Sequence, residues 1–311
     1  MPSFDYSQSQ AFFRDGFVPF KDANVSIASS PVLYGLSIYT VFGVNRNGAT
    51  GKLYAFRLKD HYARLVSSAK IMDFHNFAPA WPYERFEATM LDLVRRNAIA
   101  EDTLVRVTVF VDELIAGTKI HGLTHSLSAY AYPMGSILPR GGVNLCVSSW
   151  TRNADNAIPP RAKVNGSYAN TSLIKNEAVL NGYDDAIVLD AQGHVTEGTV
   201  ANIFLVRGGR LVTPSVGADL LEGITRDSIL RIARDLGLAA EERTVDRSEL
   251  YLADEAFLCG SSARVIPIVS IDKRPIGTGA AGTVTQKLAA VYGAAQTGID
   301  PASYAEWRME I

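Results

Sequence analysis

Two neighbouring stretches of the chain combine residue types that could do chemistry. Glu197 lies among small residues in a strand-rich region, where burying a carboxylate without a partner is costly. Farther on, Gly223, Ile224 and Thr225 lead into a helical pattern, so their backbone N–H groups and the Thr225 hydroxyl lie at its positive end. The sequence therefore predicts a functional carboxylate followed by an anion-binding helix start.

Other short patterns match known site motifs only in part. His121 and His125 are four residues apart, like a helical metal pair, but Gly122 weakens a helix and no glutamate follows the first histidine. Residues 277–282 match a dinucleotide-binding glycine pattern in letters, but no βαβ unit follows them. We therefore predict loops at both places and no bound metal.

The span from Glu197 to Arg226 resembles, at every constrained position, the long pattern of the class IV (fold type IV) pyridoxal-phosphate-dependent aminotransferases. Over most of its length the chain is most similar to the bacterial branched-chain amino-acid aminotransferases of that family. The resemblance implies a mixed α/β (α+β) fold of two domains that binds pyridoxal 5'-phosphate. It also implies a homodimer in which a loop of the partner completes each active site.

The resemblance also implies roles for single residues. Lys163, which follows Ala162, corresponds to the lysine that forms the Schiff base with the cofactor and moves a proton. Glu197 would keep the pyridine nitrogen protonated, which strengthens the ring as an electron sink. Asn202 is expected to orient the Glu197 strand. The remaining cofactor-binding residues implied by the resemblance are Arg64, Tyr168, Ile224, Thr225 and Ser261.

The substrate side resembles the branched-chain enzymes less closely. The candidate substrate residues are Tyr34, Tyr39, Arg106 and Ser262, with Phe42, Leu104 and Val109 expected to add apolar surface near the mouth of the pocket. In that family an arginine-containing Glu-Gly segment follows the first strand and a tyrosine stands two places before the later arginine. Here the corresponding positions are Thr40-Val41 and Leu104.

We therefore predict transfer of an amino group between a branched-chain or other hydrophobic L-amino acid and 2-oxoglutarate, because Arg106 would favour a substrate carboxylate. Activity on (R)-amines or D-amino acids, or as an aminodeoxychorismate lyase, remains open within the same fold. A phosphate-compound binding protein without catalysis is the alternative from another class.

The elements that must position these residues follow from hydrophobic periodicity. Strand patterns cover 31–58 and 104–112, and helical patterns cover about 59–72 and 82–97. The second half predicts two strand pairs, two helices and a capping box, at residues 186–196, 202–213, 225–236, 284–296 and 246–249, respectively.

Proline and glycine between Ser128 and Gly142 predict a linker. We therefore expect a small N-terminal α/β domain over 1–131, an interdomain loop over 132–142, and a larger cofactor-binding domain over 143–311.

Composition limits the function further. The chain has 311 residues, more than one hydrophobic core usually organises, and a formal net charge of −2. This charge argues against nucleic-acid binding, and no apolar run is long enough to cross a membrane. No secretory signal is visible, and Cys146 and Cys259 cannot form a disulfide framework. We therefore expect a cytoplasmic enzyme with small-molecule substrates.

Overall fold

The computed structural model describes residues 6–135, 138–139 and 141–311, and these residues form two compact units. The first unit takes the described residues up to Gly135 together with Ala162–Ser167 and Ala295–Ile311. The second unit takes the described residues from there to Arg161, and Tyr168–Ala294. The units thus differ from the continuous ranges expected from the sequence, because the chain returns to the first unit twice.

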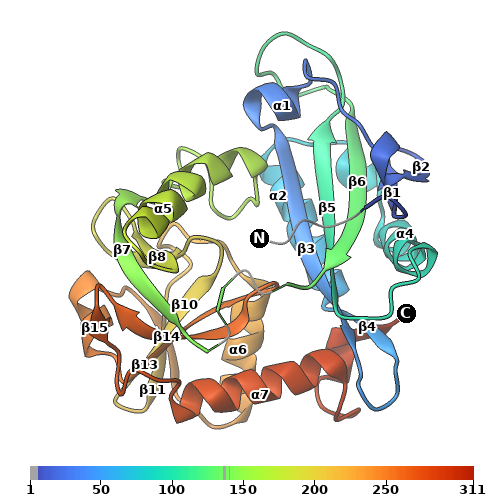
Figure 1. Cartoon of the computed structure of the whole chain (residues 1–311). Coiled ribbons are helices and arrows are strands. Elements are labelled where there is room, and N and C mark those ends of the chain that lie inside the picture. Colours follow the sequence, from blue (N-terminus) through green and yellow to red (C-terminus); the bar gives the residue numbers. More distant parts are fainter. Residues whose placement is uncertain (1–5, 136–137, 140) are drawn as a thin grey trace. The chain divides into compact units, whose positions relative to one another are not determined.

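Within the described residues, the first unit contains a seven-stranded antiparallel sheet in the order β16-β4-β3-β5-β6-β1-β2 (Figure 1). Its strands are β1 (Gln10–Phe13), β2 (Gly16–Pro19), β3 (Ser37–Arg46), β4 (Leu53–Phe56), β5 (Thr103–Val111), β6 (His125–Pro133) and β16 (Arg308–Glu310). The longest strands, β3, β5 and β6, are rich in β-branched and aromatic residues, as strand propensity requires. They form the centre of the sheet.

The helices of the first unit are α1 (Ser30–Tyr34), α2 (Leu58–Ile71), α3 (Phe77–Ala80) and α4 (Tyr83–Arg96), with 3₁₀ turns at Phe20–Asp22, Asn165–Ser167 and Ala305–Trp307. The predicted helices over 59–72 and 82–97 are therefore confirmed as α2 and α4. In α4 the buried residues Phe86, Met90, Leu93 and Val94 recur at helical spacing. Residues 30–34 form a helix rather than part of a strand.

The second unit, as far as it is described, contains a nine-stranded sheet in the order β12-β11-β10-β13-β14-β7-β8-β9, with β15 paired to β14. Its strands are β7 (Val143–Thr151), β8 (Asp185–Leu189), β9 (Val195–Gly198), β10 (Asn202–Arg207), β11 (Arg210–Pro214), β12 (Ala240–Arg243), β13 (Glu255–Gly260), β14 (Arg264–Ile271) and β15 (Arg274–Pro275). The two predicted strand pairs are present as β8–β9 and β10–β11. Parallel pairs β7–β8, β7–β14 and β11–β12 make this sheet mixed.

The helical segments of the second half are α5 (Tyr168–Leu180), α6 (Ile224–Asp235), the 3₁₀ segment Arg247–Leu252 and α7 (Thr283–Thr297). Helix α6 ends where the sequence predicts, because Gly237 just after it adopts a φ of +70°. An apolar core that includes Ile203, Leu205 and Leu258, each fully buried, supports the sheet. Burying each such side chain contributes about 1.5–3 kcal/mol.

Two local predictions are wrong. Residues 128–133 are not a linker, because β6 continues to Pro133 and pairs with β5 along its whole length. Residues 246–249 do not form a capping box, because the Glu249 carboxylate pairs with Arg207 and Arg243 instead. In both cases contacts with distant residues override the local pattern.

The rest of the expected interdomain loop is described only in part, since positions 136, 137 and 140 lie outside the described residues. Among the described residues, no helix is long and apolar enough to cross a membrane.

Candidate active site

In the first unit, Lys163 is fixed against the edge of β3 by its backbone. Its N–H donates to Ser68 Oγ of α2 at 3.1 Å, and its carbonyl accepts from the Tyr39 N–H at 2.9 Å. Val164 extends this pairing through a bridge with Ile38. The Lys163 Nζ lies 4.8 Å from the centre of the Tyr39 ring. The lysine therefore has a defined backbone position and an amine placed over an aromatic face.

A contact between two glycines brings the Lys163 segment close to the start of β3. Gly35 ends α1 with a φ of +68°, and a Cβ at Gly35 would lie only 2.6 Å from the Gly166 Cα. A larger residue would therefore push the 162–167 segment away from β3. Neither glycine stands out in the sequence, since this approach joins positions far apart in the chain.

Arg64 lies on α2 in an electropositive environment. Its Nη2 is 3.4 Å from Thr40 Oγ1, which also forms a hydrogen bond of 2.8 Å with Nδ1 of the buried His61. Burial lowers the pKa of His61 well below its usual value. Three cations add to this effect, namely Arg64, Arg57 and Lys163. A neutral imidazole next to these cations makes the environment suited to an anion.

Arg106 and Tyr39 occupy the same face of the central strands. In the β3–β5 register Tyr39 is opposite Thr108 and Arg106 is opposite Val41, so the two side chains are diagonal neighbours. The Arg106 guanidinium carbon lies 3.7 Å from the Tyr39 ring centre. Arg106 also donates to Asn165 Oδ1, and Asn165 donates to Ser37 Oγ at 2.7 Å. The first unit thus places Arg106 and Lys163 on the same tyrosine ring.

The structure separates the residues expected to form an apolar pocket mouth. Phe42 and Val109 lie on the face of the sheet opposite to Tyr39, because side chains alternate along a strand. Phe42 is fully buried near the His61 ring of α2, so it and Val109 belong to the core, and their prediction as pocket residues is wrong. Leu104 lies on the Tyr39 face but is 2 % exposed.

Tyr34 differs from the other candidate substrate residues of the first unit. It is the last residue of the short helix α1 and is 41 % exposed, whereas Tyr39 is 5 % exposed. Its neighbours Val32 and Leu33 are also exposed. Tyr34 therefore belongs to a surface of the first unit.

In the second unit, Glu197 of β9 is buried and accepts three hydrogen bonds. Arg152 Nη2 lies 2.7 Å from Oε1, and Asn202 Nδ2 donates to Oε2 at 3.0 Å. The backbone N–H of Leu221 is 3.3 Å from the same oxygen. Asn202 therefore orients Glu197, as the sequence predicts. A guanidinium and two further donors stabilise the charged form of the carboxylate.

Helix α6 begins next to this carboxylate network. Gly223 is its N-cap, and a Cβ there would lie 1.9 Å from Asn202 Oδ1. The next two residues, Ile224 and Thr225, are 8 % and 3 % exposed, and no helical carbonyl precedes their N–H groups. Thr225 Oγ1 lies 3.1 Å from the Tyr292 hydroxyl. The predicted anion-binding helix start thus exists as a well-packed element of the second unit.

The remaining predicted residues of the second unit lie at the ends of elements. Tyr168 is the first residue of α5. Ser261 and Ser262 are half-buried in the turn between β13 and β14.

Sequence reasoning missed three residues that organise the predicted ones. Arg152 pairs with Glu197, His61 binds Thr40 beside Arg64, and Asn165 binds Arg106. Arg152 and His61 stand inside the stretches used for the family resemblance, so attention to buried charge could have identified them. Asn165 follows Lys163 by two residues but contacts a strand 59 positions away, which no local pattern indicates.

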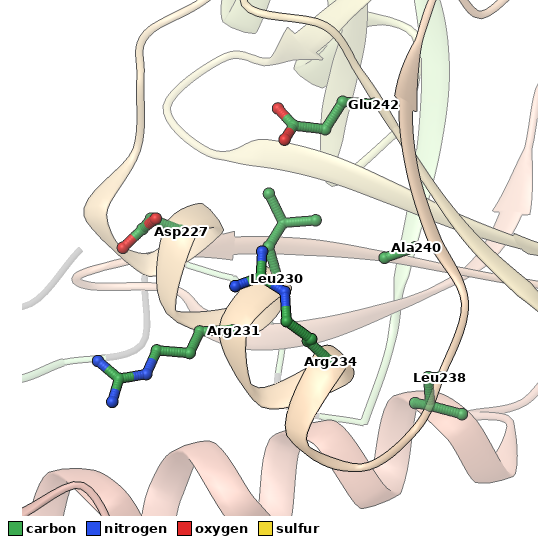
Figure 2. A pocket seen from close by; sticks show the side chains of 7 residues that line it. All are labelled: Asp227, Leu230, Arg231, Arg234, Leu238, Ala240 and Glu242. Atoms are coloured by element: carbon green, nitrogen blue, oxygen red, sulfur yellow. The ribbon is translucent and has the colours of Figure 1, made fainter.

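A surface hollow of about 320 Å³ in the second unit contains none of the predicted site residues (Figure 2). It is lined by Asp227, Leu230, Arg231, Arg234, Leu238, Ala240 and Glu242, from α6, β12 and the segment between them. Its charges are of both signs, so it does not favour one class of ion.

The chain is similar to known proteins over nearly its whole length. The family model described as amino-transferase class IV matches residues 37–271. A probable branched-chain-amino-acid aminotransferase of Aquifex aeolicus is 38 % identical over 290 residues, which cover 92 % of each chain.

Solved structures resemble the fold equally well. The branched-chain aminotransferase of Thermoproteus uzoniensis with norvaline has a TM-score of 0.90 and 35 % identity, covering 97 % of this chain and 99 % of that chain. The T.th. branched-chain amino acid aminotransferase complexed with N-(5'-phosphopyridoxyl)-L-glutamate has a TM-score of 0.87 and 36 % identity, covering 98 % and 99 %.

Proposed function

Because this chain belongs to the class IV aminotransferases, which use pyridoxal 5'-phosphate, we propose that it transfers the amino group of a branched-chain or other hydrophobic L-amino acid to 2-oxoglutarate. The norvaline and phosphopyridoxyl-L-glutamate complexes of the two structural relatives support both halves of this reaction.

The donor chemistry of the chain fits the cofactor. A phosphate dianion needs a cation and several N–H or O–H donors, which Arg64, the Ile224 and Thr225 amides and the Thr225 hydroxyl can supply. The start of α6 is kept open for such a group because Gly223 lacks a Cβ. A protonated pyridine nitrogen needs an anionic partner, and Glu197 is held in its charged form by Arg152. Tyr168 and Ser261 are the further cofactor contacts that we propose.

Lys163 carries the chemistry of this proposal. When bound, pyridoxal phosphate supplies a conjugated ring that accepts the electron pair released at the substrate Cα. Lys163 Nζ binds the cofactor aldehyde as a Schiff base before the substrate amine arrives, and then takes up and returns the Cα proton as general base and acid. The backbone hydrogen bonds to Ser68 and Tyr39 keep this amine in place.

The observation that carries the choice of substrate is the position of Arg106. Its guanidinium stacks on the same Tyr39 ring that lies under the Lys163 amine. A cation this close to the reactive amine favours a substrate with a carboxylate over a plain amine. The apolar part of the substrate would contact Tyr39 and the neighbouring face of β3, and Ser262 would bind a carboxylate oxygen.

The substrate proposal is tested by single-turnover conversion of the holoenzyme to its amine form. The reaction is run separately with L-leucine, D-alanine and (R)-1-phenylethylamine. We expect L-leucine to react fastest. If either of the other donors is faster, the substrate assignment is wrong, and that donor identifies the D-amino-acid or (R)-amine alternative.

The role of Lys163 is tested by reduction of the holoenzyme with borohydride and peptide mapping. We expect the pyridoxyl group on Lys163 and not on any of the other eight lysines. Lys163→Ala should retain phosphate-dependent cofactor binding but lose nearly all turnover. Label on another lysine would overturn the assignment.

We also propose that the chain works as a homodimer. Apolar side chains gather before and within α1, where Val25, Ile27, Val32, Leu33 and Tyr34 are all exposed, Ile27 most of all at 85 %. Contiguous exposed apolar residues of this kind are typical of an interface. A second copy of the chain is the partner that the family resemblance implies, so Tyr34 would act at the interface.

A further inference from the structure

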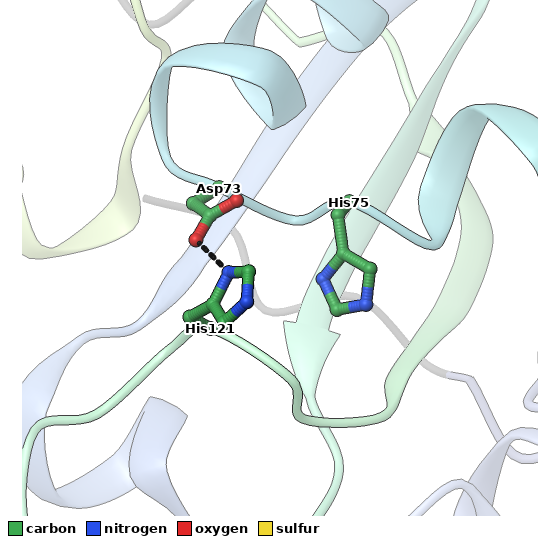
Figure 3. Close-up of side chains that lie close together, drawn as sticks. All are labelled: Asp73, His75 and His121. Carbon is green, nitrogen blue, oxygen red and sulfur yellow. Dashed lines mark hydrogen bonds and ion pairs between the residues drawn. The ribbon is translucent and has the colours of Figure 1, made fainter.

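The turn after α2 and the loop between β5 and β6 bring three potential metal ligands together. Asp73, His75 and His121 each offer one ligand atom, and these atoms all lie within 4.8 Å of one another. Asp73 Oδ2 is 2.7 Å from His121 Nδ1, and the His75 and His121 ring centres are 5.4 Å apart. Figure 3 shows the Asp73–His121 contact with the His75 ring beside it.

We propose that Asp73, His75 and His121 bind one divalent transition-metal ion, for which Zn²⁺ is the best fit. Two imidazoles and one carboxylate are a common zinc ligand set, with water completing a tetrahedron. Ligand atoms on a tetrahedral zinc ion lie about 3.3 Å apart. The present separations bracket this value, and all three residues are exposed, so small side-chain rotations are enough.

The backbone on both sides of the site is anchored, which limits the entropy lost on binding. Phe74 lies between Asp73 and His75 in the chain and is 1 % exposed. On the loop, Leu123 follows His121 by two residues and is 6 % exposed. The Asn76 side chain donates to the Leu123 carbonyl at 3.4 Å. The two segments are therefore held next to each other while their ligands point to solvent.

The site differs from the histidine pair that the sequence suggested. His125 lies in β6 with its ring stacked on Phe74 at 4.3 Å, so it is part of the packing rather than a ligand. His121 instead meets His75, a residue 46 positions earlier in the chain. The prediction of no metal considered only His121 with His125.

Metal binding would join the loop 112–124 to the turn after α2. This loop connects β5, which carries Arg106, to β6, and it includes the exposed Lys119. A metal bridge through His121 restricts the conformations that the loop can adopt. Trypsin cleavage after Lys119 therefore reports on the bridge independently of amino transfer.

The binding experiment uses holoenzyme that has been treated with chelator and dialysed, and titrates it with ZnCl₂ by calorimetry. We expect one ion per chain in the wild type. His121→Ala, His75→Ala and Asp73→Ala should each weaken binding by at least ~10-fold, the effect typical of losing a group that supports a metal. His194→Ala is the matched control, since His194 also lies near carboxylates but belongs to no such cluster among the described residues.

Two results would overturn the proposal. One is wild-type zinc affinity no higher than that of His121→Ala, and the other is equal loss of binding in His194→Ala. In the proteolysis experiment, ZnCl₂ should slow cleavage after Lys119 in the wild type and leave His121→Ala unchanged. Equal slowing in both proteins would show that zinc acts elsewhere, on the chain or on trypsin.

Discussion

At the scale of single residues, the candidate site depends on buried charges that have partners. The side chains of Arg152 and Glu197 are only 10 % and 5 % exposed, so both lose most of their hydration on folding. Their mutual attraction and the donors from Asn202 and Leu221 offset this cost. Removing one member of such a pair is more harmful than replacing both, because the other charge stays buried alone.

We predict that Glu197→Gln lowers the rate of the amino-transfer half-reaction by at least ~10²-fold, since it removes the charge that stabilises a protonated pyridine nitrogen. It should also lower the free energy of unfolding by up to about 3–5 kcal/mol, because Arg152 loses its anionic partner. Stopped-flow kinetics and chemical denaturation measure the two effects.

Glu222→Gln is the matched control for this substitution. Glu222 pairs with Arg161 at 3.1 Å, but both side chains are substantially exposed. The same chemical change there should cost at most about 1 kcal/mol and leave the rate unchanged. A Glu197→Gln enzyme with wild-type kinetics would mean that Glu197 serves only to pair with Arg152.

At the scale of elements, the start of α6 connects the carboxylate network with the proposed phosphate site. Gly223 packs against Asn202, Asn202 binds Glu197, and Thr225 is tied to Tyr292 of α7. Helix α6 is thereby fixed at the end where its N–H groups are available for an anion. A change at this one position should affect both the carboxylate and the anion site.

Gly223→Ala tests this arrangement. Its φ of −74° suits any residue, so the expected damage comes only from the new Cβ, which would meet Asn202 Oδ1. We expect a stability loss of about 1–3 kcal/mol, as for other overpacked sites, with weaker binding of pyridoxal phosphate to the apoenzyme. Thermal unfolding and a fluorescence titration of the cofactor measure these changes.

Gly217→Ala is the control, because a Cβ there meets only Ser215 Oγ at 3.9 Å. It lies in the same segment before α6 and should leave stability and cofactor affinity close to the wild-type values. If Gly223→Ala behaves in the same way, the contact with Asn202 has no energetic importance.

At the scale of the whole molecule, the surface around α1 is incomplete in a single chain. Ile27, Val32 and Leu33 are 85, 53 and 52 % exposed, which leaves apolar area in water that a second copy could cover. Scattered exposed leucines are ordinary, but a run of apolar residues on one short segment is not.

We predict that the double substitution Ile27→Asp and Leu33→Asp halves the molecular mass measured by light scattering, because two buried charges at an interface cannot find partners. Leu252→Asp is the control, since Leu252 is 63 % exposed but lies in the second unit, away from this segment of the sequence. A double variant that keeps the wild-type mass would exclude the α1 surface as the dimer interface.

The sequence by itself determined the features that depend on neighbouring residues. The periodicity of α2, α4 and α6, the strand pairs β8–β9 and β10–β11, and the pattern from Glu197 to Arg226 are all encoded within short stretches. Hydrophobic spacing and backbone sterics act over a few residues, so these features are legible without the fold.

Only the tertiary structure decided which distant residues meet. Arg152 pairs with Glu197, Arg106 binds Asn165, and the strand register turns Phe42 away from Tyr39. Likewise, β16 pairs with β4, which returns the end of the chain to the first unit. Such contacts join residues from about 45 to more than 250 positions apart. Their geometry depends on how whole sheets align, and no local spacing contains that information.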